Sequence, residues 1–132
     1  MPKFSEKSKK LLSGCDARLY EICMNAIEIM DFTIITGYRG KDAQNKAFAE
    51  GNSKIKYPQS KHNIYPSRAI DIAPYPIDWK DHNRFVLLAG VMLGIAHEHN
   101  VKLRWGGDWS GDFNLKDNKF SDLGHFEIVE ME

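Results

Sequence analysis

The hydrophobic positions change their period along the chain, and each change predicts a different element. Between residues 16 and 30, apolar side chains recur on one face of a helix, and Asp16 is placed to cap its N-terminus. Residues 32–36 are rich in β-branched side chains and predict a strand that ends at Gly37. Residues 41–50 then predict a short helix.

The middle of the chain passes from a loop into a strand with two unlike faces. Residues 51–68 are rich in proline, asparagine and serine, which favour turns. Residues 69–73 predict a strand in which Ile70 and Ile72 face the core. Asp71 lies on the opposite face between two alanines, and these small side chains leave room for a metal or a substrate.

The second half predicts one long helix followed by two strands. The helix runs from Asp78 to about residue 100, and because residues 85–96 are apolar nearly all round it, we expect it to be the central buried helix. Residues 102–105 and 125–129 predict strands, with an irregular stretch between them. This order favours an α+β fold with helices on a small, mainly antiparallel sheet.

Composition places the chain among soluble globular proteins of one domain. We expect residues 1–132 to form a single domain, because 42% apolar and 27% charged residues fit one hydrophobic core. Lysine plus arginine equals aspartate plus glutamate, 18 against 18, so no net field recruits nucleic acid or an anionic membrane. A basic cluster (Lys3, Lys7, Lys9 and Lys10) is interpreted as a solvated helix face, with weak attraction to an anionic polymer such as a cell wall as the alternative. We expect a monomer.

Neither the first residues nor the cysteines indicate a secreted protein. No apolar stretch of a secretory signal follows Met1, and residues 85–96 are shorter than the roughly 20 residues that span a bilayer. We therefore expect synthesis in a cytoplasm without a signal peptide. Cys15 and Cys23 lie about 12 Å apart if they share one helix, which is beyond disulfide reach, so free and mostly buried thiols are expected.

Two of the five histidines are candidate metal ligands. His62 and His125 each stand at a predicted loop–strand boundary, whereas the other three fall on the long helix. With Asp71 they supply two imidazoles and a carboxylate, a set that can hold a catalytic zinc with one coordination position open. A buried Asp71 that instead pairs with an arginine remains an alternative, although its burial would be costly without good hydrogen bonds.

Other polar and aromatic side chains are candidates around this set. Asp122, three residues before His125, is placed to act as a general base. Glu127 shares a strand face with His125 and is interpreted as its orienting partner, with the role of base as the alternative. Ser53 and Ser60 are candidate substrate contacts, although Ser60 equally suits turn capping. The aromatic residues Tyr38, Trp105 and Trp109 either line a substrate groove or belong to the core.

The ordered series of motifs closely resembles the zinc peptidases of the D-alanyl-D-alanine carboxypeptidase (VanY-like) and L-alanyl-D-glutamate endopeptidase group, and most of all their small phage endolysins. Its anchors are Thr36-Gly37-Tyr38-Arg39, Gln44-Asn45, Gly51-Asn52-Ser53, Ser60-Lys61-His62, Ala69-Ile70-Asp71, Arg104-Trp105-Gly106-Gly107-Asp108-Trp109 and Asp122-Leu123-Gly124-His125-Phe126-Glu127. The resemblance implies the domain shared by hedgehog proteins and these DD-peptidases.

The resemblance also implies a site and an activity. It implies that His62, Asp71 and His125 bind Zn²⁺, that Asp122 is the base, and that Arg39 steadies the substrate or the developing oxyanion. The substrate contacts expected with it are Gln44, Ser53, Ser60 and Trp109. The implied reaction is hydrolysis of the L-alanyl–D-glutamate bond of peptidoglycan stem peptides by a zinc-activated water, after a holin releases the enzyme to the cell wall.

Two alternatives and one departure accompany this interpretation. A D-alanyl-D-alanine carboxypeptidase shares the chemistry, and hedgehog domains show that a zinc-containing domain of this kind can serve binding alone. The family pattern places the aspartate seven residues after the first histidine, whereas Asp71 follows His62 by nine. Because both residues flank a loop, we expect residues 63–68 to bulge outward without displacing either ligand.

Overall fold

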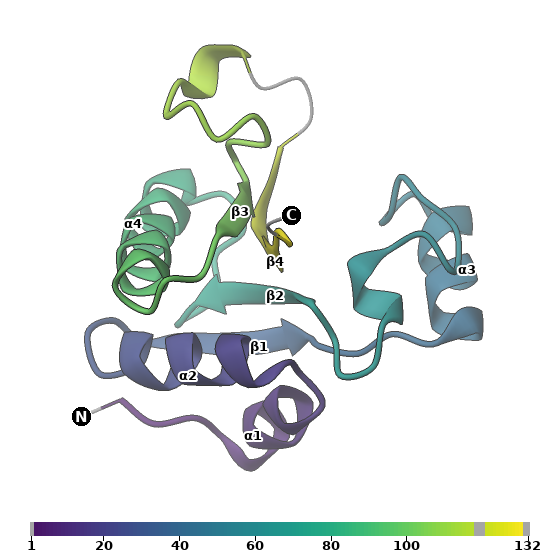
Figure 1. Cartoon of the computed structure of the whole chain (residues 1–132), viewed down its shortest axis with the longest axis horizontal. Coiled ribbons are helices and arrows are strands. Elements are labelled where there is room, and N and C mark those ends of the chain that lie inside the picture. Colours follow the sequence, from purple (N-terminus) through teal and green to yellow (C-terminus); the bar gives the residue numbers. More distant parts are fainter. Residues whose placement is uncertain (1, 118–120, 131–132) are drawn as a thin grey trace.

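A twisted sheet of four antiparallel strands forms the centre of the computed structural model, which describes residues 2–117 and 121–130 (Figure 1). The strand order is β1-β2-β4-β3, so the last strand in the chain lies between two earlier ones. The strands are β1 (Phe32–Thr36), β2 (Ala69–Pro74), β3 (Leu103–Gly106) and β4 (Asp122–Ile128). The predicted α+β fold with an antiparallel sheet is therefore confirmed.

Helices cover one face of this sheet. Helices α1 (Glu6–Ser13), α2 (Ala17–Ala26) and α4 (His82–Glu98) contribute their buried side chains to one core with the strands. Helix α3 (Lys41–Ala49) lies apart, beside the 3₁₀ turn η1 (Lys61–Asn63) at the right of Figure 1. A second 3₁₀ turn, η2 (Leu115–Asp117), lies in the segment that projects at the top.

The alternation of side chains along the central strands separates the core from the site. Ile70 and Ile72 of β2 belong to the hydrophobic core, as their positions in the sequence predict. Phe126 of β4 extends the same core from the neighbouring strand. Asp71 and His125 alternate with these residues and therefore lie on the face that α1, α2 and α4 leave uncovered.

The N-terminal helices are formed largely as the sequence predicts. Asp16 caps α2 through a 2.9 Å hydrogen bond from the backbone N–H of Arg18 to its carboxylate. The helix ends at Ala26 rather than near residue 30, and Ile29, which the predicted stripe places inside, is 66% exposed. Cys15 precedes α2 instead of lying on it, and both cysteines are free and buried.

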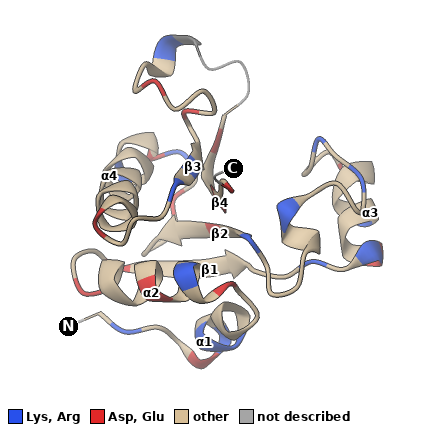
Figure 2. Ribbon diagram, viewed as in Figure 1, with Lys and Arg blue, Asp and Glu red and all other residues tan. Residues whose placement is uncertain are grey.

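Charged residues are spread over the ribbon without separating by sign (Figure 2). The lysines of α1 are exposed, as expected for a solvated helix face, and Lys9 pairs with Glu6, three residues earlier in the helix. None of the helices that the structure describes combines the length and hydrophobicity needed to cross a bilayer.

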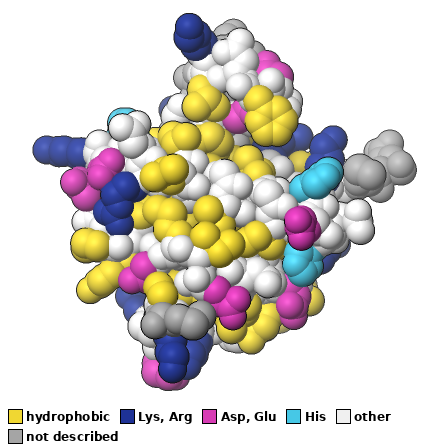
Figure 3. Space-filling view, turned by 90° about the vertical axis from the view of Figure 1, so that its left-hand side faces the viewer, with side chains coloured by type: hydrophobic (Ala, Val, Ile, Leu, Met, Phe, Trp, Pro, Cys, Tyr) yellow, Lys and Arg dark blue, Asp and Glu magenta, His cyan; other side chains and the backbone are white. Residues whose placement is uncertain are grey.

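The expectation that α4 is buried all round is wrong. The helix begins at His82, because residues 78–81 form a turn, and only its inner face is buried. Leu87 is 65% exposed on the outer face. Figure 3, which views the left-hand side of Figure 1, shows hydrophobic side chains gathered over much of this surface. The domain has only two layers here, and no described segment packs over the outer face of the helix.

Candidate metal centre and active-site cleft

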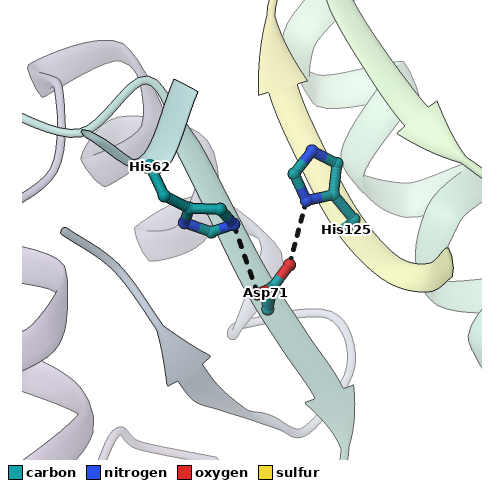
Figure 4. A group of neighbouring side chains, drawn as sticks. All are labelled: His62, Asp71 and His125. Carbon is teal, nitrogen blue, oxygen red and sulfur yellow. Dashed lines mark hydrogen bonds and ion pairs between the residues drawn. The ribbon is translucent and has the colours of Figure 1, made fainter. Parts of the chain in front are cut away.

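His62, Asp71 and His125 converge from three separate segments of the chain (Figure 4). His62 Nε2 lies 3.2 Å from Asp71 Oδ2, and His125 Nδ1 lies 3.0 Å from Asp71 Oδ1. One ligand atom from each residue lies within 4.8 Å of the others. These three residues could therefore hold a metal ion.

Strand pairing places two of the three residues. Asp71 of β2 and His125 of β4 are direct partners in the antiparallel register, so their side chains leave the same face side by side. Gly124 makes this possible, because a Cβ there would collide with the backbone carbonyl of Ile72. The glycine thus allows β4 to approach β2 closely next to the ligand histidine.

Local hydrogen bonds place the third residue. The Ser60 hydroxyl accepts from the backbone N–H of His62 (3.1 Å), and the Ser60 N–H donates to the Asn63 side chain (3.0 Å), which forms a capping box around η1. Ser60 thus has the capping role considered for it; it is largely buried but also lines the cleft over the site, so its substrate contact stays a prediction. In the loop that follows, Ile64 is 40% and Tyr65 69% exposed, and His62 Nε2 still lies 3.2 Å from Asp71 Oδ2.

The environment of His62 fits a cation. Its Nδ1 lies 2.8 Å from the Gly37 carbonyl, which can only accept, so Nδ1 carries the proton and Nε2 of the neutral ring is a lone-pair donor. That Nε2 is buried and makes no hydrogen bond, although it lies 3.2 Å from a carboxylate oxygen of Asp71. Two electron-rich atoms this close are stabilised when a cation binds both.

His125 is held between two carboxylates. Its Nε2 lies 2.9 Å from Glu127 Oε1, and its Nδ1 faces Asp71. Burial alone would lower the pKa of His125, but the hydrogen bonds to Asp71 and Glu127 raise it to about 9 in the metal-free protein. Glu127 is in turn flanked by Lys61 Nζ at 3.4 Å and Arg104 Nη1 at 3.7 Å. A hydrogen bond from Nε2 to Glu127 leaves Nδ1 free to bind a metal.

The pKa values of the carboxylates reflect the same arrangement. Burial would raise the pKa of Asp71, but the hydrogen bond with His125 and the adjacent His62 ring hold it well below the usual range. The pKa of Asp122 is raised, chiefly by burial and further by the negative charge of Asp71. A carboxyl group whose pKa is raised towards neutrality suits a group that takes up and returns a proton.

Arg39 is fixed by a buried amide that we had expected to contact substrate. Arg39 Nε donates to Gln44 Oε1 at 2.7 Å, and the Gln44 amide donates to the Ser53 hydroxyl (2.9 Å) and the Ile55 carbonyl (2.6 Å). Gln44 is fully buried, so the expectation of a substrate contact is wrong for this residue. Ser53 does line the cleft, but its hydroxyl is also bonded to the backbone of Ile55.

A cleft of about 290 Å³ opens over the three metal-ligand candidates, with Arg39 and Asp122 in its walls. Trp109 lines it with its ring centre 5.4 Å from that of His125, in the groove position considered for it. Trp105 belongs to the core instead, where its indole N–H donates to the Leu123 carbonyl at 2.8 Å. The remaining aromatic candidate, Tyr38, packs edge-on against Tyr65, and the three other histidines are exposed on or next to α4.

Sequence reasoning missed the cations that hold Glu127. Arg104 is the direct strand partner of Glu127, so pairing β3 with β4 in register would have indicated it. Lys61 stands next to the candidate ligand His62, and its Nζ also donates to the Ile128 carbonyl at 2.6 Å. Only the tertiary fold brings Lys61 to β4, and no local pattern predicts that contact.

Comparison with known proteins identifies the family of this chain. The model of the phage L-alanyl-D-glutamate peptidase family matches residues 1–129. The chain belongs to this family. It is 36% identical to the L-alanyl-D-glutamate peptidase of Escherichia phage T5 over 138 residues, a match covering 96% of this chain and 98% of that protein. The crystal structure of the Serratia marcescens L-Ala D-Glu endopeptidase ChiX has the same fold, with a TM-score of 0.76 at 20% identity over 96% of this chain and 90% of the other.

Proposed function

We propose that this chain is a zinc-dependent peptidase that hydrolyses the L-alanyl–D-glutamate bond of peptidoglycan stem peptides. The observation that carries the proposal is the convergence of His62, Asp71 and His125 in one cleft with Asp122. The family match and the phage relative support the choice of bond. As an endolysin of this type, the protein would be made in the host cytoplasm and act on the cell wall as a monomer.

The donor set favours zinc. Two imidazole nitrogens and one carboxylate oxygen match catalytic zinc sites, in which three protein ligands leave one position for water or substrate. The uncompensated Nε2 of His62 and the orientation of His125 by Glu127 support the same choice. When bound, zinc would supply Lewis acidity and lower the pKa of a bound water.

The residues around the metal position have distinct roles in this proposal. Asp122 accepts a proton from the attacking water as its oxygen bonds to the scissile carbonyl carbon. Asp122 then returns that proton to the leaving nitrogen as the carbon–nitrogen bond breaks. The Arg39 guanidinium, held through Nε by Gln44, offers its terminal N–H groups to the oxyanion, an effect often worth about 3 kcal/mol per donor.

The alternatives find less support. A D-alanyl-D-alanine carboxypeptidase would use the same chemistry, but the matching family model and the phage relative both name the other bond. A non-catalytic zinc domain needs no base, whereas Asp122 lines the cleft as a half-buried carboxyl with a raised pKa.

Digestion of purified peptidoglycan with the zinc-loaded protein tests the proposal. Mass spectrometry of the released fragments should show new D-glutamyl amino termini, and chelation should abolish their release. Asp122→Asn should retain one zinc per chain and lose at least about a hundredfold in kcat, in the range for a lost general base. Fragments with other new termini, or an active Asp122→Asn variant, would contradict the corresponding part of the proposal.

A further inference from the structure

The active-site cleft continues into a second and larger one. A cleft of about 610 Å³ lies between β1, α3 and the turn before α4, and it shares Arg39, Asn52, Asp71 and Asp122 with the first cleft. Asp71 and Asp122 of the reactive centre line both clefts, whereas His62 and His125 line only the smaller one, so we treat the two clefts as arms of one groove. A substrate chain bound along this groove can extend on both sides of the bond that is cut.

The two arms differ in chemistry. The smaller arm contains Lys54 and polar side chains such as Gln59. It also contains Lys61, whose Nζ is held by Glu127 and the Ile128 carbonyl.

The larger arm is lined by Ile35 of β1 and by Ala43 and Ala47 of α3, and it includes the indole ring of Trp79. Its two charged side chains from α3 and the residue after it, Lys46 and Glu50, have opposite signs. We name these the lysine arm and the tryptophan arm.

Trp79, the indole of the tryptophan arm, is both exposed and fixed. Its ring stacks on Phe85 with centres 5.6 Å apart and planes inclined by 24°, and Phe85 is only 3% exposed. Trp79 itself is 57% exposed. With one ring face packed on Phe85, the opposite face is available to a ligand, and a preformed apolar platform of this kind loses little entropy on binding.

The two sides of the proposed substrate differ in the same way as the arms. On the amino side of the bond, L-alanine is joined by an amide to the lactyl group of N-acetylmuramic acid, a bulky and uncharged sugar. On the carboxyl side, the D-glutamyl residue carries a free carboxylate. A pyranose presents C–H groups on its ring face that pack on an indole, whereas carboxylates pair with lysine.

We propose that the tryptophan arm is a binding site for the muramyl sugar, with Trp79 as its platform. This inference rests on the proposed function, because it takes the stem peptide as substrate. The volume of the arm falls within the range of small-molecule sites. The peptide then runs with its D-glutamyl side in the lysine arm, so the enzyme recognises the attachment point of the peptide to the glycan.

Two substrates separate a sugar contact from a general effect. One is a muramyl tripeptide, and the other is the same L-alanyl-D-glutamyl tripeptide without the sugar. Trp79→Ala should lower kcat/KM about tenfold on the muramyl peptide, mainly through KM, and leave the sugar-free peptide unchanged. Trp79→Phe should restore part of the loss. The matched control Tyr75→Ala removes an aromatic that is 58% exposed and lies outside both arms, and it should alter neither substrate.

A binding experiment keeps the inference independent of the bond cleaved. N-acetylmuramyl-L-alanine lacks that bond, and its binding to the zinc-loaded protein can be followed by calorimetry. Binding by the wild type that weakens about tenfold in Trp79→Ala supports the sugar site, even if fragment analysis identifies a different bond. Equal binding by both proteins, or an equal loss of activity on both substrates, would overturn it.

Discussion

Glu127→Gln removes a negative charge beside His125 while keeping the shape of the side chain. In the wild type, Glu127 Oε1 lies 2.9 Å from His125 Nε2, and the Glu127 side chain is only 13% exposed. A glutamine oxygen can still accept this hydrogen bond, but a bond to a neutral acceptor is roughly half as strong as a charge-assisted one. The substitution also leaves the charges of Lys61 and Arg104 without their carboxylate, close to the position of the metal.

Both changes weaken metal binding, and their size can be bounded. Loss of a group that orients a ligand histidine typically costs 10- to 100-fold in metal affinity, which corresponds to about 1.4–2.7 kcal/mol. The added repulsion from the two cations acts in the same direction. We therefore expect the zinc Kd of Glu127→Gln to rise at least about tenfold.

Competition with a chromophoric chelator at neutral pH measures this Kd directly. Glu130→Gln is the matched control, because Glu130 carries the same charge and pairs with Arg68 at 3.0 Å and Arg18 at 3.3 Å but is 50% exposed at the surface. The control should bind zinc like the wild type. A zinc Kd for Glu127→Gln equal to that of the control would refute the reasoning.

Three further expectations follow from contacts elsewhere in the site and in the fold. Gln44→Ala removes the buried acceptor of Arg39 Nε, so kcat should fall, and the free energy of unfolding by urea should drop by about 1–3 kcal/mol; wild-type kcat would show that Arg39 is held by other means. Asp16→Ala removes the cap of α2 and the partner of Arg18 and should cost about 1 kcal/mol at neutral pH. The hydrogen bonds from Arg18 lower the pKa of Asp16 in the folded state despite partial burial. The difference in free energy of unfolding between wild type and variant is therefore fully present above the unfolded pKa of Asp16, and it should vanish as the pH falls through the folded pKa. A stability difference that persists in acid would contradict this. Finally, His125 has a pKa of about 9 in the metal-free protein, so zinc binding at pH 7 should release close to one proton from it, seen by calorimetry in buffers of different ionisation enthalpy; an enthalpy that is the same in all buffers would argue against this.

The metal-ligand candidates could be predicted because their signals are local. Asp71 stands out as a carboxylate in an apolar strand, and His62 and His125 stand at strand and loop boundaries. The alternation of β2 also predicts correctly which of its residues enter the core. These inferences need only the period of the strand and the chemistry of each side chain.

The errors concern what lies next to an element in space. A run of apolar residues does not reveal whether a second layer covers it, so α4 was expected to be buried while Leu87 is exposed. Gln44 was expected to contact substrate, but its side chain instead bonds Arg39 and the Ile55 carbonyl, and the second of these contacts depends on how residues 51–55 fold back onto α3. The sequence pattern indicates whether a residue favours a buried or an exposed position. The exposure of Leu87 and the partners of Gln44 depend instead on which segments of the chain pack against them in the fold.

The direct pairing of Asp71 with His125 also bears on the order of assembly. The two residues are separated by 54 positions in the chain, and β4 inserts between β2 and β3. A nascent or partly unfolded chain therefore has isolated donors but no chelating pocket until this late, long-range closure occurs. Metal binding should therefore occur only after β4 has paired with β2, so the chain should have no catalytic activity until the sheet is complete.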